Sequence, residues 1–191
     1  MKKLSIFLLI AFATLRFSAY AQENLEGNRE QLLSVYKDVK RLKNIEKLQK
    51  TLAKGPAKSE LSNVDGLAGD ATVILTETLA INELLPNLYT RSIGQTIDGV
   101  TEVNVKKPTV EELLEVSTRI ALNVKATTDA TSKLSGAGDE VKGVKNPMKA
   151  KKALNIINYT KDALSFSADE LVLQGKLINS LIETIKTSDN L

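Results

Sequence analysis

The sequence contains no cysteine, no histidine and no tryptophan. Histidine is the commonest acid–base group near neutral pH and the commonest metal ligand, and cysteine supplies thiol nucleophiles and disulfide bonds. Their absence excludes the usual zinc sites, histidine-assisted serine chemistry, cysteine hydrolases and disulfide-stapled domains. Only carboxylate or serine–lysine chemistry remains open to an enzyme, so we expect a non-catalytic protein without a cofactor.

The first 21 residues have the three regions of a secretory signal peptide. Lys2 and Lys3 form a positive start, residues 4–15 form an apolar stretch, and a small-x-small cleavage site ends at Ala21. The apolar stretch is shorter than the ~20 residues that span a bilayer, which disfavours a membrane anchor. We predict that a bacterial signal peptidase cleaves before Gln22 and that the mature protein is periplasmic or secreted.

Removal of this segment changes the balance of charge. The whole chain carries 26 basic and 23 acidic residues, a net charge of +3. Three of the basic residues, Lys2, Lys3 and Arg16, lie in the first 21 residues, which leaves 23 residues of each sign. Nucleic-acid binding needs a clustered cationic excess and benefits from stacking aromatics. The mature chain has neither an overall excess nor many aromatic rings, so no nucleic-acid function is expected.

Apolar periodicity in the mature chain predicts helices. Residues 25–52 carry apolar side chains at steps of three and four, so we expect one amphipathic helix, ended by the glycine–proline pair at 55–56. A second pattern covers residues 59–88 and contains Pro86. Because proline removes one backbone hydrogen bond and clashes with the preceding turn, this second helix is expected to be kinked or broken at Pro86.

Residues 94–107 are expected to form an irregular connection, with a short β-hairpin as an open alternative. Thr109 is predicted to begin a third helix, because Glu112 stands three residues later as in a capping box. The glycine-rich residues 135–138 are expected to end this helix and to lead into a loop that continues to residue 144.

The last helical pattern is the longest. Asn146 and Pro147 suit the cap and the first position of a helix, and an apolar stripe continues to Ile185. Such elements, joined by short or moderate connections, predict an all-α fold, an antiparallel up-down helical bundle of three to four long helices. Residues 22–191 form a single domain in this prediction.

The start of the last helix carries the main cluster of like charge in the mature chain. Its members are Lys142, Lys145, Lys149, Lys151 and Lys152. Cations at a helix N-terminus oppose the helix macrodipole. One hypothesis is therefore that the cluster contacts a partner or another anion, and the alternative is an ordinary solvated helix start.

The third helix has a seam of hydroxyl residues at core-facing spacing, formed by Ser117, Thr127 and Thr131. One interpretation is a polar groove. The favoured one is that the hydroxyls bond to carbonyls of their own preceding turns. The two acidic pairs at 139–140 and 169–170 are interpreted as solvated faces, since adjacent side chains on a helix diverge by about 100°.

These observations favour an exported non-catalytic helical-bundle protein that acts as an interaction or structural module of the bacterial envelope. Its partner would be another envelope protein. One alternative is a membrane-active amphipathic helical protein that contacts a membrane surface without spanning it. Another is a binder of a small apolar ligand between helices, where bundles commonly hold ligands.

Overall fold

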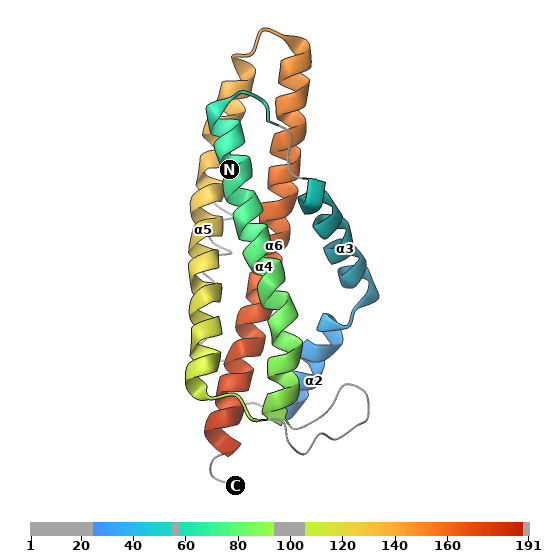
Figure 1. Ribbon diagram of the computed structural model, residues 1–191, viewed down its shortest axis with the longest axis vertical. Coiled ribbons are helices and arrows are strands. Elements are labelled where there is room, and N and C mark those ends of the chain that lie inside the picture. Colours follow the sequence, from blue (N-terminus) through green and yellow to red (C-terminus); the bar gives the residue numbers. More distant parts are fainter. Residues whose placement is uncertain (1–24, 55–57, 94–105, 189–191) are drawn as a thin grey trace.

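The computed structural model describes residues 25–54, 58–93 and 106–188, and every regular element in those ranges is a helix (Figure 1). The five helices are α2 (Leu25–Tyr36), α3 (Val39–Lys54), α4 (Ser62–Ile93), α5 (Val110–Lys142) and α6 (Pro147–Ser188). The all-α prediction is confirmed. The predicted signal peptide with its cleavage site, and residues 94–105 of the predicted connection, lie outside the described ranges.

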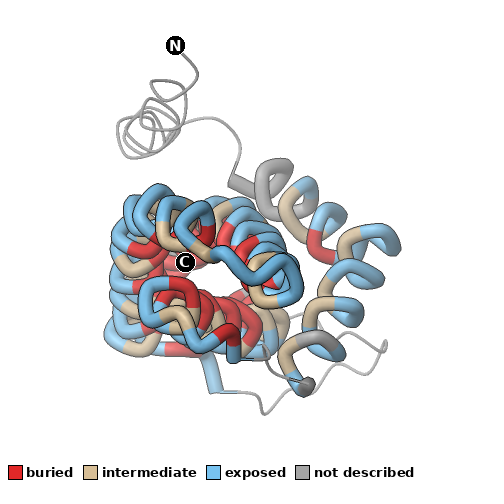
Figure 2. The backbone as a smooth tube through the Cα atoms, turned by 90° about the horizontal axis from the view of Figure 1, so that it is seen from above, coloured by how far each residue is buried: buried red, intermediate tan, exposed pale blue. Residues whose placement is uncertain are grey.

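Helices α4, α5 and α6 lie side by side along the long axis of the molecule, and α2 and α3 flank them (Figure 1). Seen along that axis, the buried residues of the three long helices face one another, whereas the flanking helices carry mostly half-buried and exposed residues (Figure 2). The fold is thus a core of three helices, α4, α5 and α6, with a peripheral arm formed by α2 and α3.

The core divides into two clusters along the axis. In the upper cluster, Leu67 from the first half of α4 packs with Ala137 from the end of α5 and with residues from the first half of α6. In the lower cluster, Leu85 from the second half of α4 packs with Leu113 from the start of α5 and Leu181 from the end of α6. Each long helix contributes to both clusters, so the three helices support one another over their whole length.

Residues 25–52 do not form the single helix that their periodicity predicted. α2 ends at Tyr36 and α3 begins at Val39. Between them, the Asp38 carboxylate oxygen Oδ1 accepts a hydrogen bond of 2.8 Å from the backbone N–H of Arg41, which is the geometry of a helix N-cap. The buried Tyr36 ring holds the end of α2 against the bundle, and the cap starts a new helix in another direction (Figure 1).

α4 continues through Pro86 as one helix, so the predicted break is absent. A proline in a helix interior costs about 3 kcal/mol. On either side of it, Leu79, Leu85 and Leu88 are buried in the core, and burial of one leucine side chain contributes roughly 1.5–3 kcal/mol. Packing of this stretch therefore outweighs the cost of the proline.

α5 also continues past the point where the sequence predicted its end. Gly136 and Gly138 are helical, and the helix ends only at the C-cap Gly143. Ala137, between the two glycines, is fully buried in the upper cluster. The predicted loop is wrong over residues 135–142, because burial of Ala137 and Val141 in the upper cluster outweighs the helix penalty of the glycines, about 1 kcal/mol each. Residues 143 and 144 lie outside the helix, as expected.

We expect Gly138→Ala to raise the free energy of unfolding by about 1 kcal/mol, because alanine restricts the unfolded chain and favours a helix. A Cβ at position 138 meets no atom within 4 Å, so the substitution introduces no clash. Urea denaturation measures the change. Gly143→Ala is the matched control: it lies past the last turn, where the gain should be smaller, and equal gains at the two sites would contradict a helix through residue 138.

Candidate functional site

The end of the bundle where α5 turns into α6 carries all five lysines of the predicted cluster, Lys142, Lys145, Lys149, Lys151 and Lys152 (Figure 1). Lys142 donates a hydrogen bond of 2.7 Å to Asp139, and Lys149 donates one of 3.3 Å to Glu60. The other three lysines are exposed, and so is Met148 beside them, with 84% of its surface accessible. We call this surface the lysine end.

Two polar side chains cap the starts of helices at the lysine end. A carboxylate oxygen of Glu140 accepts hydrogen bonds from the backbone N–H groups of Asn63 (2.9 Å) and Val64 (3.2 Å) in the first turn of α4. Asn146 accepts hydrogen bonds of 3.0 and 3.2 Å from two N–H groups in the first turn of α6, which confirms it as the N-cap. The exposed lysines thus lie on the turn between α5 and α6 (Lys145) and on the capped start of α6 (Lys151 and Lys152).

Asp65 orders the chain just before α4. Its carboxylate accepts hydrogen bonds of 2.7 Å from both the backbone N–H and the hydroxyl of Ser59, and one of 2.9 Å from the N–H of Glu60. Partial burial acts to raise the pKa of Asp65, but these hydrogen bonds outweigh it and hold the pKa below its usual value. They also stabilise the positive φ of Glu60, 65°, which places this residue next to Lys149.

The hydroxyl seam of α5 does not converge on one point. Thr127 and Thr131 each donate a hydrogen bond of 2.7 Å to a carbonyl of the preceding turn, in agreement with the favoured interpretation. Ser117 is half-buried and stands ten residues before Thr127, about 15 Å along the helix. The buried polar contact of this region is made instead by Asn123, whose amide donates to Thr78 at 2.9 Å.

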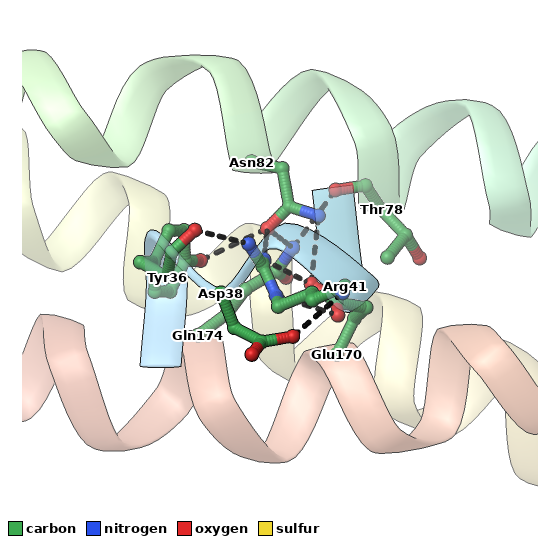
Figure 3. Close-up of polar contacts among 7 residues, drawn as sticks. All are labelled: Tyr36, Asp38, Arg41, Thr78, Asn82, Glu170 and Gln174. Atoms are coloured by element: carbon green, nitrogen blue, oxygen red, sulfur yellow. Dashed lines mark hydrogen bonds and ion pairs between the residues drawn. The ribbon is translucent and has the colours of Figure 1, made fainter. Parts of the chain in front are cut away.

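A buried polar network joins α3 to the core helices (Figure 3). The Arg41 guanidinium contacts both carboxylate oxygens of Glu170 on α6, with a distance of 2.9 Å from Nε to Oε1. It also donates to the carbonyl of Tyr36 at 3.0 Å and to the Asn82 amide oxygen at 3.1 Å. Asn82 in turn donates to Glu170 at 2.8 Å, and Gln174 donates to Asn82 at 3.0 Å.

Tyr36 completes this network. The Arg41 guanidinium carbon lies 4.1 Å from the centre of the Tyr36 ring, a cation–π contact. Burial raises the pKa of the Tyr36 hydroxyl well above its usual value, so the hydroxyl stays protonated and donates a hydrogen bond of 2.9 Å to Asn82. Within the described residues, these groups pair with one another except for the buried amide oxygen of Gln174, which has no hydrogen-bond partner. The network has the form of a structural joint between α2, α3, α4 and α6.

The sequence patterns did not predict this network, and the expectation that the 169–170 pair is solvated is wrong for one of its two residues. Asp169 is exposed as expected, but Glu170 is only 5% exposed. One signal was present: Arg41 stands four residues before Ile45 on the face of α3 that packs on the bundle. A charged residue on an apolar stripe indicates a buried partner, although the spacing does not identify that partner.

An open groove of about 260 Å³ lies between α4 and α5. Its lining residues are Leu84, Asn87, Leu88, Arg91, Glu112, Glu115, Val116 and Arg119. Arg91 donates to both carboxylate oxygens of Glu112, at 2.6 and 3.0 Å, and Arg119 donates to Glu77 at 2.7 Å. The hydrogen bond from Arg91, opposed by burial, lowers the pKa of Glu112. Both arginines are thus neutralised within the chain and are poorly placed to recruit a charged ligand.

Among the described residues, no group of three or more acidic side chains is placed to hold a metal ion. None of the helices α2 to α6 combines the length and the apolarity needed to cross a membrane. No known protein family matches the sequence, and no curated protein or solved structure is a match.

Proposed function

We propose that this protein is an exported, non-catalytic helical bundle that acts as an interaction or structural module of the bacterial envelope. Its contact surface is the lysine end, and its partner is an envelope protein with an acidic surface. The observation that carries the proposal is the charge of this end: residues 141–160 contain the five lysines of the cluster and no acidic residue.

Two physical arguments favour a partner at the lysine end. Lysines at the start of α6 face the positive end of the helix dipole, which costs about 0.3–1 kcal/mol for a charge in the first turn, and a bound acidic surface relieves this repulsion. The exposed Met148 adds an apolar side chain among the charges. Methionine is enriched at protein interfaces relative to the rest of the surface, whereas lysine is depleted there, so the lysines would lie on the polar rim around the methionine.

We further propose that α4, α5 and α6 form an antiparallel up-down bundle and that α4 bends at Pro86. The composition of the upper core cluster supports the alternation, since it combines the start of α4, the end of α5 and the start of α6. In such a bundle the α5–α6 turn lies at one end of the core. A partner can then contact the lysines without disturbing the helix packing.

Charge reversal tests the proposal. In the triple variant Lys145→Glu, Lys151→Glu, Lys152→Glu, we expect partner capture to fall by about tenfold or more, because like charges then meet across the interface. The unfolding free energy should change little, because exposed charges contribute little to stability. A photocrosslinking amino acid at Met148, used in cells of the natural host, measures the capture as the yield of a discrete adduct.

A matched control carries the same change of charge at exposed lysines elsewhere: Lys107→Glu, Lys161→Glu, Lys176→Glu. This control variant should give the same yield of crosslinked adduct from position 148 as the protein with the lysine end unchanged. The proposal would be contradicted if both triple variants lost the same fraction of the adduct. It would also be contradicted if the protein with only the crosslinking amino acid at position 148 formed no adduct.

A further inference from the structure

α3 has a strongly asymmetric distribution of charge. Its 16 residues include six basic residues and a single acid, Glu46. Lys40, Lys43, Lys47 and Lys50 follow one another at steps of three, four and three, which places them on one face of the helix over about 15 Å. All four are exposed.

The opposite face of α3 holds the helix to the bundle. Ile45, Leu48 and Leu52 are half-buried against the upper core cluster, and Arg41 on the same face forms the ion pair with Glu170. The lysine face therefore points away from the core helices. It is available to a partner without any change of fold.

The lysine face repels itself and is bordered by uncovered apolar side chains. Like charges three or four residues apart destabilise a helix by roughly 0.2–0.5 kcal/mol per pair. Glu46, the acid of α3, accepts a hydrogen bond of 2.5 Å from Lys50. Val39, at the edge of this face, is 64% exposed, and Leu42 is 48% exposed. An occupant that matches this surface must be anionic and must also accept apolar groups.

We propose that the lysine face of α3 binds the surface of a bilayer rich in anionic phospholipid, with Val39 and Leu42 entering the headgroup region. Such a surface offers negative charge over the whole length of the lysine row and an apolar boundary beneath it. A soluble polyanion satisfies the lysines but leaves the valine and the leucine in water. The contact is peripheral, and it is independent of a protein partner at the lysine end.

Vesicle binding tests this inference. The purified protein should sediment with vesicles that contain equal parts of phosphatidylglycerol and phosphatidylcholine at about 0.05 M salt, and should leave them at about 0.5 M salt, where exposed charges are screened. It should not bind pure phosphatidylcholine. In the variant Lys40→Gln, Lys43→Gln, Lys47→Gln, the affinity should fall about a hundredfold, since each lysine near an anionic bilayer contributes roughly fivefold.

Two control variants carry the same loss of charge, and both should keep the affinity of the unmodified protein within about threefold. One changes three scattered lysines, Lys107, Lys161 and Lys176, to glutamine. The other changes Lys145, Lys151 and Lys152 at the lysine end. Glutamine and lysine have similar helix propensities, so circular dichroism should show unchanged helix content in all three triple variants.

The chain has no tryptophan, so a single introduced tryptophan reports on apolar contact. Leu42→Trp should show a blue shift of its fluorescence with anionic vesicles and no shift with inorganic polyphosphate, whereas Leu122→Trp on the exposed face of α5 should show no shift with either. The inference is overturned if anionic vesicles do not bind, if the α3 variant binds as tightly as its controls, or if the tryptophan at position 42 stays in water.

Discussion

Arg41→Ala is expected to lower the free energy of unfolding by about 3 kcal/mol or more, because it removes the partner of a buried carboxylate. Glu170 then keeps the hydrogen bond from Asn82 but loses both contacts with the guanidinium. If α3 stays in place, an unpaired charge is left in the interior. If α3 leaves the bundle, its three half-buried apolar residues lose their cover. Both outcomes are costly, and urea denaturation measures the loss.

A double variant separates the ion pair from simple packing. Arg41→Met with Glu170→Met removes both charges and keeps side chains of similar length, so most of the loss in the single variant should be recovered. Lys43→Ala on the same helix changes an exposed side chain and should shift stability by less than about 0.5 kcal/mol. An Arg41→Ala protein as stable as the Lys43→Ala protein would show that the network does not hold α3.

Local signals in the sequence were sufficient for several elements of the fold. Asn146 and Pro147 mark the start of α6 because their effect is confined to the first helical turn, and Asn146 accepts hydrogen bonds from that turn as predicted. Thr109 likewise accepts a hydrogen bond of 3.1 Å from the N–H of Glu112. The long apolar stripe of α6 predicted a buried helix, and Leu171, among others, lies in the core.

Two of the errors have the same physical origin, which is that a distant contact outweighed a local preference, whereas the third is a local signal that was overlooked. Arg41 and Glu170 are 129 residues apart in the chain, so no spacing rule connects them. The glycines of α5 favour a helix end locally, but Glu140 beyond them reaches the first turn of α4. In the arm, Asp38 has the residue type of an N-cap. Because the apolar periodicity continues on both sides of it, one helix was predicted where α2 and α3 are two.

The lysine end and the lysine face of α3 also differ in whether the sequence predicted them. The lysine end could be read from the sequence because its charges are neighbours in the chain. The lysine face of α3 could not be recognised as a free surface until the packing of Ile45 and Leu48 showed which side of the helix is covered. A periodic pattern identifies two faces of a helix, and only the tertiary contacts determine which face remains open to a partner.

Ala137→Asp is expected to destabilise the protein by about 3–5 kcal/mol, the usual effect of an uncompensated buried charge. Ala137 is 0% exposed and belongs to the upper core cluster with Leu67 and Ala153. Since burial raises the pKa of a carboxyl group, the loss should shrink as the pH falls toward about 4 and the introduced acid takes up a proton. Denaturant titrations at neutral and acid pH measure both effects.

Gly136→Asp is the matched control, because it introduces the same charge one residue earlier at an exposed position where a Cβ meets no atom within 4 Å. A helix that continues through this segment turns the two neighbouring side chains to different sides, so the control should change stability by less than about 0.5 kcal/mol. A loop at 135–138 has no such difference between neighbours. Similar effects of the two substitutions would therefore refute the extension of α5, and with it the support that Glu140 gives to the lysine end.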